Sequence, residues 1–167
     1  MIKDTTKVPE FLAMLDALMN TSVHVGIFSE TEDAKLLMIA NVHEFGVSIQ
    51  VTDKMRRYLA AQGLPLRKTT TQINIPERSY IRSSFDEQKG NIEDQARKLL
   101  IQVLELRLPP LTFFDVLGGI MVSMVQEYMV NLSDPPNHPF TIERKGSSNP
   151  LIDTGRLVGA VTHKVVN

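Results

Sequence analysis

The stretch LRLPPLTFFDVLGGIMVSMVQEYMVNL, residues 106–132, decides the fold because it joins two long helical patterns through a pair of prolines. In residues 112–132 the apolar positions recur every three or four residues, the spacing of one buried helix face: Phe113, Leu117, Ile120, Met124 and Tyr128. Residues 79–107 show the same spacing from Ile92 to Leu104, with Gly90 as an expected break, and Pro109-Pro110 ends that helix. Two such helices predict an antiparallel pair packed on a small sheet.

Two adjacent glycines, Gly118 and Gly119, lie inside the second helical pattern. Each glycine weakens an isolated helix by about 1 kcal/mol relative to alanine. Because glycine has no side chain, another part of the chain can approach it closely. The pair therefore predicts a close helix crossing at this point.

Shorter elements surround the helix pair. We expect helices at residues 9–18, 33–45 and 52–62, and strands at residues 22–29, 47–51 and 158–166. Residues 64–75 are polar and threonine-rich, and form either an extended hairpin arm or a mobile loop. The sequence thus predicts one α+β domain over residues 1–167, in which a small mixed or antiparallel sheet packs against two long helices, with shorter N-terminal helices and an extended polar arm or loop.

Composition narrows the classes of function. The chain has 167 residues, 43% of them hydrophobic and 22% charged, with a net charge of −1 and no cysteine. The charge argues against a dedicated nucleic-acid binder, and the basic pairs Arg56-Arg57 and Arg67-Lys68 are interpreted as solvated surface, with contact sites as the alternative. Without cysteine there are no disulfides and no thiol chemistry. We expect neither a signal peptide nor a membrane span, and therefore folding in a cytoplasm.

The triplet Asp153-Thr154-Gly155 is the one that aspartic proteases use for a catalytic carboxylate. Such a site needs two carboxylates that share a proton, so a dimer would have to supply the second. Only 12 residues follow Gly155, and the long helices do not suit an all-β protease. The alternative is a structural turn, in which Asp153 and Thr154 bind backbone amides, Gly155 adopts unusual torsion angles, and Arg156 reaches a carboxylate or a neighbouring subunit.

Other catalytic patterns are incomplete. A zinc protease helix needs a second histidine four residues after His43, where the chain has Val47. The remaining histidines, His24, His138 and His163, are scattered, and no glycine-rich phosphate loop occurs. We therefore expect no metal and no cofactor. A hydrolase with a serine nucleophile stays open as an alternative, because residue types alone do not exclude it.

Several landmarks then line up in order along the chain: VGIF at residues 25–28, ANVHEFG at 40–46, INIPERSYIR at 73–82 and FTIERKGSSNPLIDTGRLVGAV at 140–161. Together they resemble the neck and tail-completion proteins of long-tailed bacteriophages, also called virion morphogenesis or head-tail joining proteins. The most specific pieces are residues 43–46, residues 75–82 and residues 150–157. The segment 52–71 looks longer than the common core of that family, and Ser79-Tyr80 stand where proline and phenylalanine are frequent.

This resemblance implies a non-enzymatic virion protein, assembled in the host cytoplasm, that forms a sixfold or twelvefold ring at the neck. Its expected partners are further copies of itself, the connector or adaptor, and the tail tube or tail terminator protein. Contact with DNA in the lumen would be passive and without sequence specificity, and no membrane is involved. The alternatives are a hydrolase or protease that uses Asp153, and an adaptor that binds another protein without forming a ring.

Ring subunits meet through two different surfaces. An extended segment can add to the sheet of a neighbour, so we expect the polar segment at residues 64–75 and the strand edge at residues 45–51 to contribute to the subunit interface. The candidate interface residues are Phe45, Gly46, Ile49, Val51, Thr70, Ile73, Ile75, Arg78 and Arg82.

Overall fold

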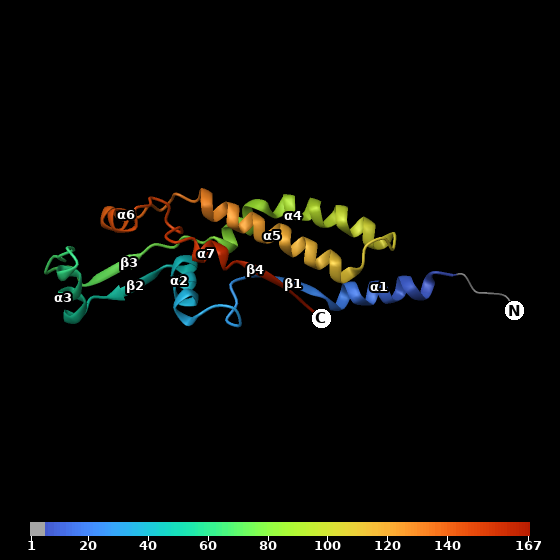
Figure 1. The fold of residues 1–167 in the computed structure, drawn as a ribbon, viewed down its shortest axis with the longest axis horizontal. Coiled ribbons are helices and arrows are strands. Elements are labelled where there is room, and N and C mark those ends of the chain that lie inside the picture. Colours follow the sequence, from blue (N-terminus) through green and yellow to red (C-terminus); the bar gives the residue numbers. More distant parts are fainter. Residues whose placement is uncertain (1–5) are drawn as a thin grey trace.

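The computed structural model describes residues 6–167 and has the expected α+β architecture in an elongated shape (Figure 1). The helices of this described part are α1 (Val8–Asn20), α2 (Ala34–Phe45), α3 (Asp53–Ala61), α4 (Ile81–Leu104), α5 (Pro110–Asn131), α6 (Pro139–Lys145) and α7 (Arg156–Gly159). The strands are β1 (Ser22–Gly26), β2 (Val47–Gln50), β3 (Gln72–Ile75) and β4 (Thr162–Val166). They form two separate antiparallel sheets, β1 with β4 and β2 with β3.

The two long helices, α4 and α5, lie side by side in opposite directions, as expected (Figure 1). Helix α1 packs beside this pair near the connection between the two helices. The three helices share an apolar cluster of Met14, Val103, Phe113 and Leu117. The break expected near Gly90 is wrong, since α4 is continuous through that residue. A Cβ at Gly90 would meet nothing within 4 Å, so this glycine is exposed and its cost of about 1 kcal/mol is small beside the packing of a 24-residue helix.

The first sheet joins the beginning and the end of the described chain, because Ser22 of β1 pairs with Val166 of β4. Helix α5 covers one face of this sheet. A Cβ built on Gly118 would lie 2.7 Å from the Val23 Cγ2 atom and closer still to the Cδ2 atom of the His163 ring. Gly118 therefore permits a close approach of α5 to the sheet, not to another helix, and the predicted helix crossing is wrong.

The main apolar core lies where α2, α5 and the C-terminal segment meet. Its buried residues are Leu36, Ala40, Tyr80, Val125, Met129, Leu151, Leu157, Ala160 and Val161. Helix α5 contributes to both apolar clusters. By length and composition alone it is long and apolar enough to cross a membrane, a test that the core helix of a folded domain also passes. In this fold it is the central helix, packed on α4, α1 and the first sheet.

Residues 47–75, called the arm from here on, project from one end of the molecule (Figure 1). Strands β2 and β3 pair from Val47 with Ile75 to Gln50 with Gln72, and α3 lies beyond them. Part of the threonine-rich segment is therefore a strand, as in the hairpin alternative, while residues 64–71 connect α3 to it. Helix α6, which the sequence did not predict, lies beside the arm (Figure 1).

Replacing Gly118 with alanine tests the close approach of α5 to the sheet. The added methyl group has to displace the His163 ring and the Val23 side chain, so we expect a loss of about 1–3 kcal/mol in the free energy of unfolding, measured with urea. Gly119→Ala is the matched control, because its Cβ would meet only the His163 ring edge at 4.0 Å. That variant should gain up to about 1 kcal/mol from helix propensity. Equal effects of the two variants would contradict the packing described here.

Candidate assembly interface

The carboxylate of Glu44 ties the end of α2 to the start of α4. It accepts hydrogen bonds from the backbone N–H groups of Tyr80 (2.8 Å), Ile81 (3.0 Å) and Arg82 (3.2 Å). The Ser79 hydroxyl donates to it at 2.8 Å, and the Arg82 guanidinium at 3.0 Å. Unpaired N–H groups at a helix start favour a negative charge, so Glu44 serves as the N-terminal cap of a helix that begins 37 residues later in the chain.

Glu44 is only 5% exposed, yet it is charged in the folded protein. Burial acts to raise the pKa of its carboxyl group, but the hydrogen bonds from Ile81, Ser79, Arg82 and Tyr80 outweigh burial and hold the pKa below its usual value. In the last turn of α2 a carboxylate is unfavourable for its own helix. That misplaced charge is the sequence signal that could have identified Glu44, and it was missed.

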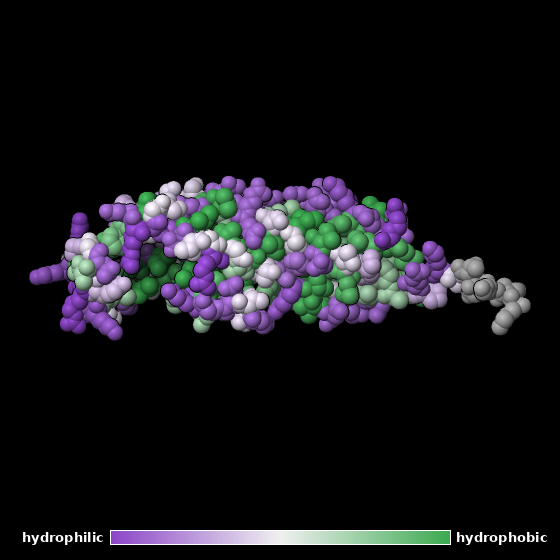
Figure 2. Space-filling view, viewed as in Figure 1, coloured by the Kyte–Doolittle hydropathy of each residue, from purple (hydrophilic) through white to green (hydrophobic). Residues whose placement is uncertain are grey.

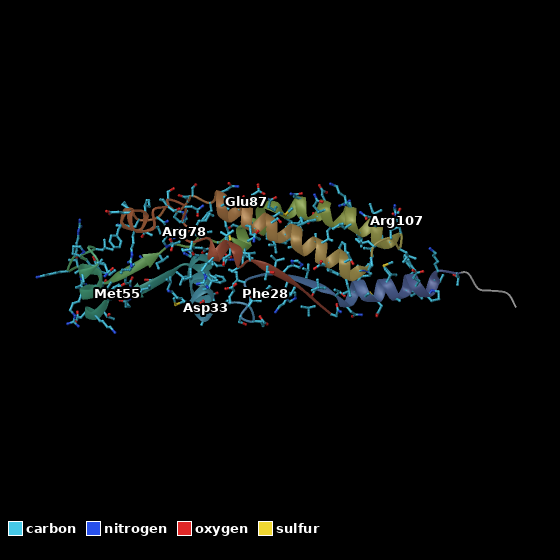
Figure 3. All side chains as sticks on the ribbon, viewed as in Figure 1. Phe28, Asp33, Met55, Arg78, Glu87 and Arg107 are labelled. Carbon is cyan, nitrogen blue, oxygen red and sulfur yellow. The ribbon has the colours of Figure 1, made fainter. Side chains whose placement is uncertain are left out.

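Gly46 and Arg78 complete the same junction. Gly46 has φ of +66°, and a Cβ there would lie 2.8 Å from the Glu77 backbone nitrogen. The Arg78 N–H donates to the His43 carbonyl at 2.7 Å. Its buried guanidinium donates to the carbonyls of Pro135 (2.8 Å) and Pro136 (2.9 Å), where the arm meets the helix pair (Figure 3). Both residues thus contact atoms of the same subunit at this junction.

His43 lies beneath this junction with its Nδ1 atom buried and without a hydrogen-bond partner in the described part of the chain. Burial lowers its pKa to about 4, and the positive charges of Arg78 and Lys145 act in the same direction. The imidazole is therefore neutral at physiological pH. It is not placed as a metal ligand, because no group of three or more histidine or acidic side chains within residues 6–167 could hold a metal ion.

A groove of about 740 Å³ separates the arm from α6 and the loop before it. Figure 2 shows this hollow as a dark green recess between the arm and the rest of the molecule. Its lining is mainly apolar and includes Leu64, Leu66, Ile73, Ile75, Pro76, Pro136 and Phe140. One face of the second sheet is apolar and half-buried, with Val47, Ile49, Ile73 and Ile75, while the opposite face is polar and exposed.

The remaining interface candidates lie on or near the arm. Ile49, Ile73 and Ile75 belong to its apolar face, and the Val51 N–H extends the ladder to the Thr71 carbonyl at 2.8 Å. Thr70 accepts a hydrogen bond from Arg56 through its carbonyl. Phe45 is 59% exposed, and the Arg82 guanidinium lies over its ring at 4.8 Å from the centroid. Phe45 and Arg82 are thus surface residues beside the arm.

The turn at residues 153–156 is built differently from the sequence prediction. Asp153 and Thr154 are exposed and make no hydrogen bond within the described chain. The backbone amides of Leu151 and Ile152 are instead bound by the Asn149 side chain, at 2.8 and 3.0 Å. The same side chain donates to the last carbonyls of α5, those of Met129 and Val130.

Two other expectations for this turn agree with the structure. Gly155 adopts the left-handed conformation with φ of +79°, so its predicted torsion angles are confirmed. The guanidinium of Arg156 pairs with the Asp33 carboxylate at 3.0 Å, which is the first of its two predicted roles. This ion pair joins α7 to the residue that caps α2.

Asp153 lines a hollow of about 470 Å³, together with Lys35, Lys145 and Arg156. It is the only carboxylate among the residues that line this hollow. An acid protease needs two carboxylates that share a proton, so in such a protease the second would have to come from another copy of the chain. No family model, curated protein or solved structure matches the chain.

Replacing Glu44 with glutamine should lower the free energy of unfolding by about 2–4 kcal/mol, because the cap loses its charge and Arg82 its partner. Glu77→Gln is the control, since Glu77 pairs with the same Arg82 at the surface and should cost less than about 1 kcal/mol. The difference in free energy of unfolding between the natural protein and Glu44→Gln should shrink as pH falls below 4.5 and through the lowered pKa of Glu44, because the carboxylate is then protonated. Urea unfolding at several pH values checks both points, and a cost no larger than that of Glu77→Gln would contradict the cap.

The protonation of His43 should also contribute to the pH dependence of the free energy of unfolding. The unfolded chain binds a proton at this residue below 6.5, whereas the folded protein does so only near 4. Stability from the neutral, buried imidazole is therefore complete above 6.5 and is lost as pH falls from 6.5 towards 4. Urea unfolding of His43→Gln should show a smaller loss over this range than the natural protein, while His24→Gln, at an exposed position, should behave like the natural protein. An unchanged slope in His43→Gln would contradict this prediction.

Proposed function

We propose that the chain is a non-enzymatic structural protein of a long-tailed bacteriophage, which forms a ring at the neck and joins or completes the tail. The observation that carries this proposal is the convergence of the three most specific landmarks. Residues 43–46 and 75–82 are joined through Glu44 and through the bond from the Arg78 N–H to His43. Residues 150–157 belong to the same core, since Leu151 and Leu157 cluster with Tyr80. The motifs that resemble the family thus build one structural unit.

The shape of the subunit supports assembly as a ring. A ring contact is heterologous, so one surface has to complement a different surface of the next copy. The arm projects at one end, and α1 lies at the other with Val8, Leu12 and Met19 exposed (Figure 1). The apolar groove beside the arm offers a surface that a neighbouring copy can cover. In this proposal the ring is sixfold or twelvefold, contacts the connector and the tail tube or terminator, and resides in the virion.

The apolar arm face gives a specific test of assembly. Ile73→Asp should weaken ring formation by purified protein, because it places a carboxylate in the proposed contact, while Gln50→Asp on the exposed polar face and outside the groove should leave assembly nearly unchanged. Native mass spectrometry measures the ring, and circular dichroism checks that both variants stay folded. Equal assembly of the two folded variants would remove this face from the interface.

The role in the virion is tested separately. Electron microscopy of phage particles should show the protein at the junction of head and tail, and loss of its gene should leave filled heads and free tails that do not join. The protein supplied from a plasmid should restore joining. A protein found only free in the lysate and never in particles would contradict the proposed function.

A further inference from the structure

The end of the arm carries a concentrated positive charge. Residues 53–71, called the tip, hold five basic residues and one acidic residue: Lys54, Arg56, Arg57, Arg67, Lys68 and Asp53. Their net charge is +4, so with −1 for the whole chain the rest carries −5. None of these five cations forms an ion pair with another residue in the part of the chain that the structure covers. The charge of the tip is thus unneutralised by the protein itself.

Arg56 fixes the two basic pairs of the tip relative to each other. Its guanidinium donates to the carbonyls of Arg67 (2.7 Å), Thr70 (2.7 Å) and Leu66 (3.3 Å). These bonds hold the loop after α3 against the helix, so that Arg67 and Lys68 share one end of the molecule with Lys54 and Arg57. Figure 3 shows this end around Met55, where long side chains point away from the body. A set of like charges held together at a projecting end favours a partner that is negatively charged.

The side chains around these cations indicate what kind of partner fits. Lys54, Arg57, Arg67 and Lys68 are exposed, and the exposed face of the adjoining sheet carries Ser48, Gln50, Gln72 and Asn74. These are the side-chain types that bind phosphate and sugar. Tyr58, 56% exposed, is the only large apolar side chain exposed on the arm. Protein interfaces have an apolar core, whereas nucleic-acid interfaces are polar and positive, so the tip fits a nucleic acid better than a protein.

We propose that the tip binds the phosphate backbone of duplex DNA without base specificity. A duplex is favoured over a single strand because binding of single strands relies on several aromatic side chains for stacking, and the tip exposes only Tyr58. The structure assigns phosphate contacts to Lys54, Arg57, Arg67 and Lys68, while Arg56 positions the loop. This inference rests on the tip alone and does not depend on the proposed neck role.

The test is fluorescence anisotropy of a labelled duplex of about 30 bp with the full-length protein, in about 25 mM salt and upward. The tip variant combines Lys54→Gln, Arg57→Gln, Arg67→Gln and Lys68→Gln, and keeps Arg56. Its affinity for the duplex should fall by about tenfold or more, and the slope of log K against log salt should flatten by up to about 3.6, at about 0.9 for each phosphate contact. The matched control combines Lys35→Gln, Lys89→Gln, Arg97→Gln and Lys98→Gln, which are exposed positions outside the arm. It removes the same charge and should change the affinity by less than about threefold.

Four results would overturn the proposal. The first is that the natural protein does not bind the duplex at low salt. The second is that both variants lose the same affinity, which would indicate that net charge alone drives binding. The third is that a single strand of equal length binds as tightly as the duplex. The fourth is a tip variant that keeps its DNA affinity but loses self-association in native mass spectrometry, because the tip would then contact protein. None of these outcomes bears on whether the protein is found in virions, so the two proposals fail independently.

Discussion

The arrangement of this protein depends on one buried carboxylate. Glu44 ends the helix that packs on the main core, and it binds the first amides of the helix that forms half of the long pair. The arm leaves the body within three residues of this carboxylate and returns just before its partners, because β2 begins at Val47 and β3 ends at Ile75. The same contact therefore fixes the angle between α2 and α4 and clamps both ends of the arm. Arg78 adds a second tie, to the loop that follows α5.

The buried core lies in the body of the molecule and not in the arm. The body contains both apolar clusters, formed by α1, α2, α4, α5 and the C-terminal segment. The arm has no residue of either buried cluster and is held by strand pairing, by Arg56 and by its clamped base. An element with little core of its own can change its surface without destabilising the body. The stability of the fold therefore resides mainly in the body.

The sequence predicted those features that depend on neighbours along the chain. The long helices, the α+β class and the left-handed Gly155 follow from local spacing and from backbone preference. It failed where the partner lies far away, as in the capping of α4 by Glu44, the binding of Asn149 to the end of α5, and the approach of Gly118 to His163. Asp153 shows the same limit, because a familiar triplet suggested hydrogen bonds that Asn149 makes instead. The sequence also did not indicate that the two basic pairs of the arm lie close together. The hydrogen bonds from Arg56 that hold them together span 10 to 14 residues of the chain.

The pairing of β1 with β4 has a consequence for biosynthesis. β4 leaves the ribosome after every other described element, yet it supplies half of the sheet under the glycine face of α5. Until Thr162 to Val166 have emerged, that helix face and the edge of β1 stay uncovered, and pairings between such distant segments form slowly. A chain interrupted before this point lacks β4 and exposes apolar surface to chaperones and proteases. Folding of the body around α5 is thus complete only when residues 162–166 have joined β1.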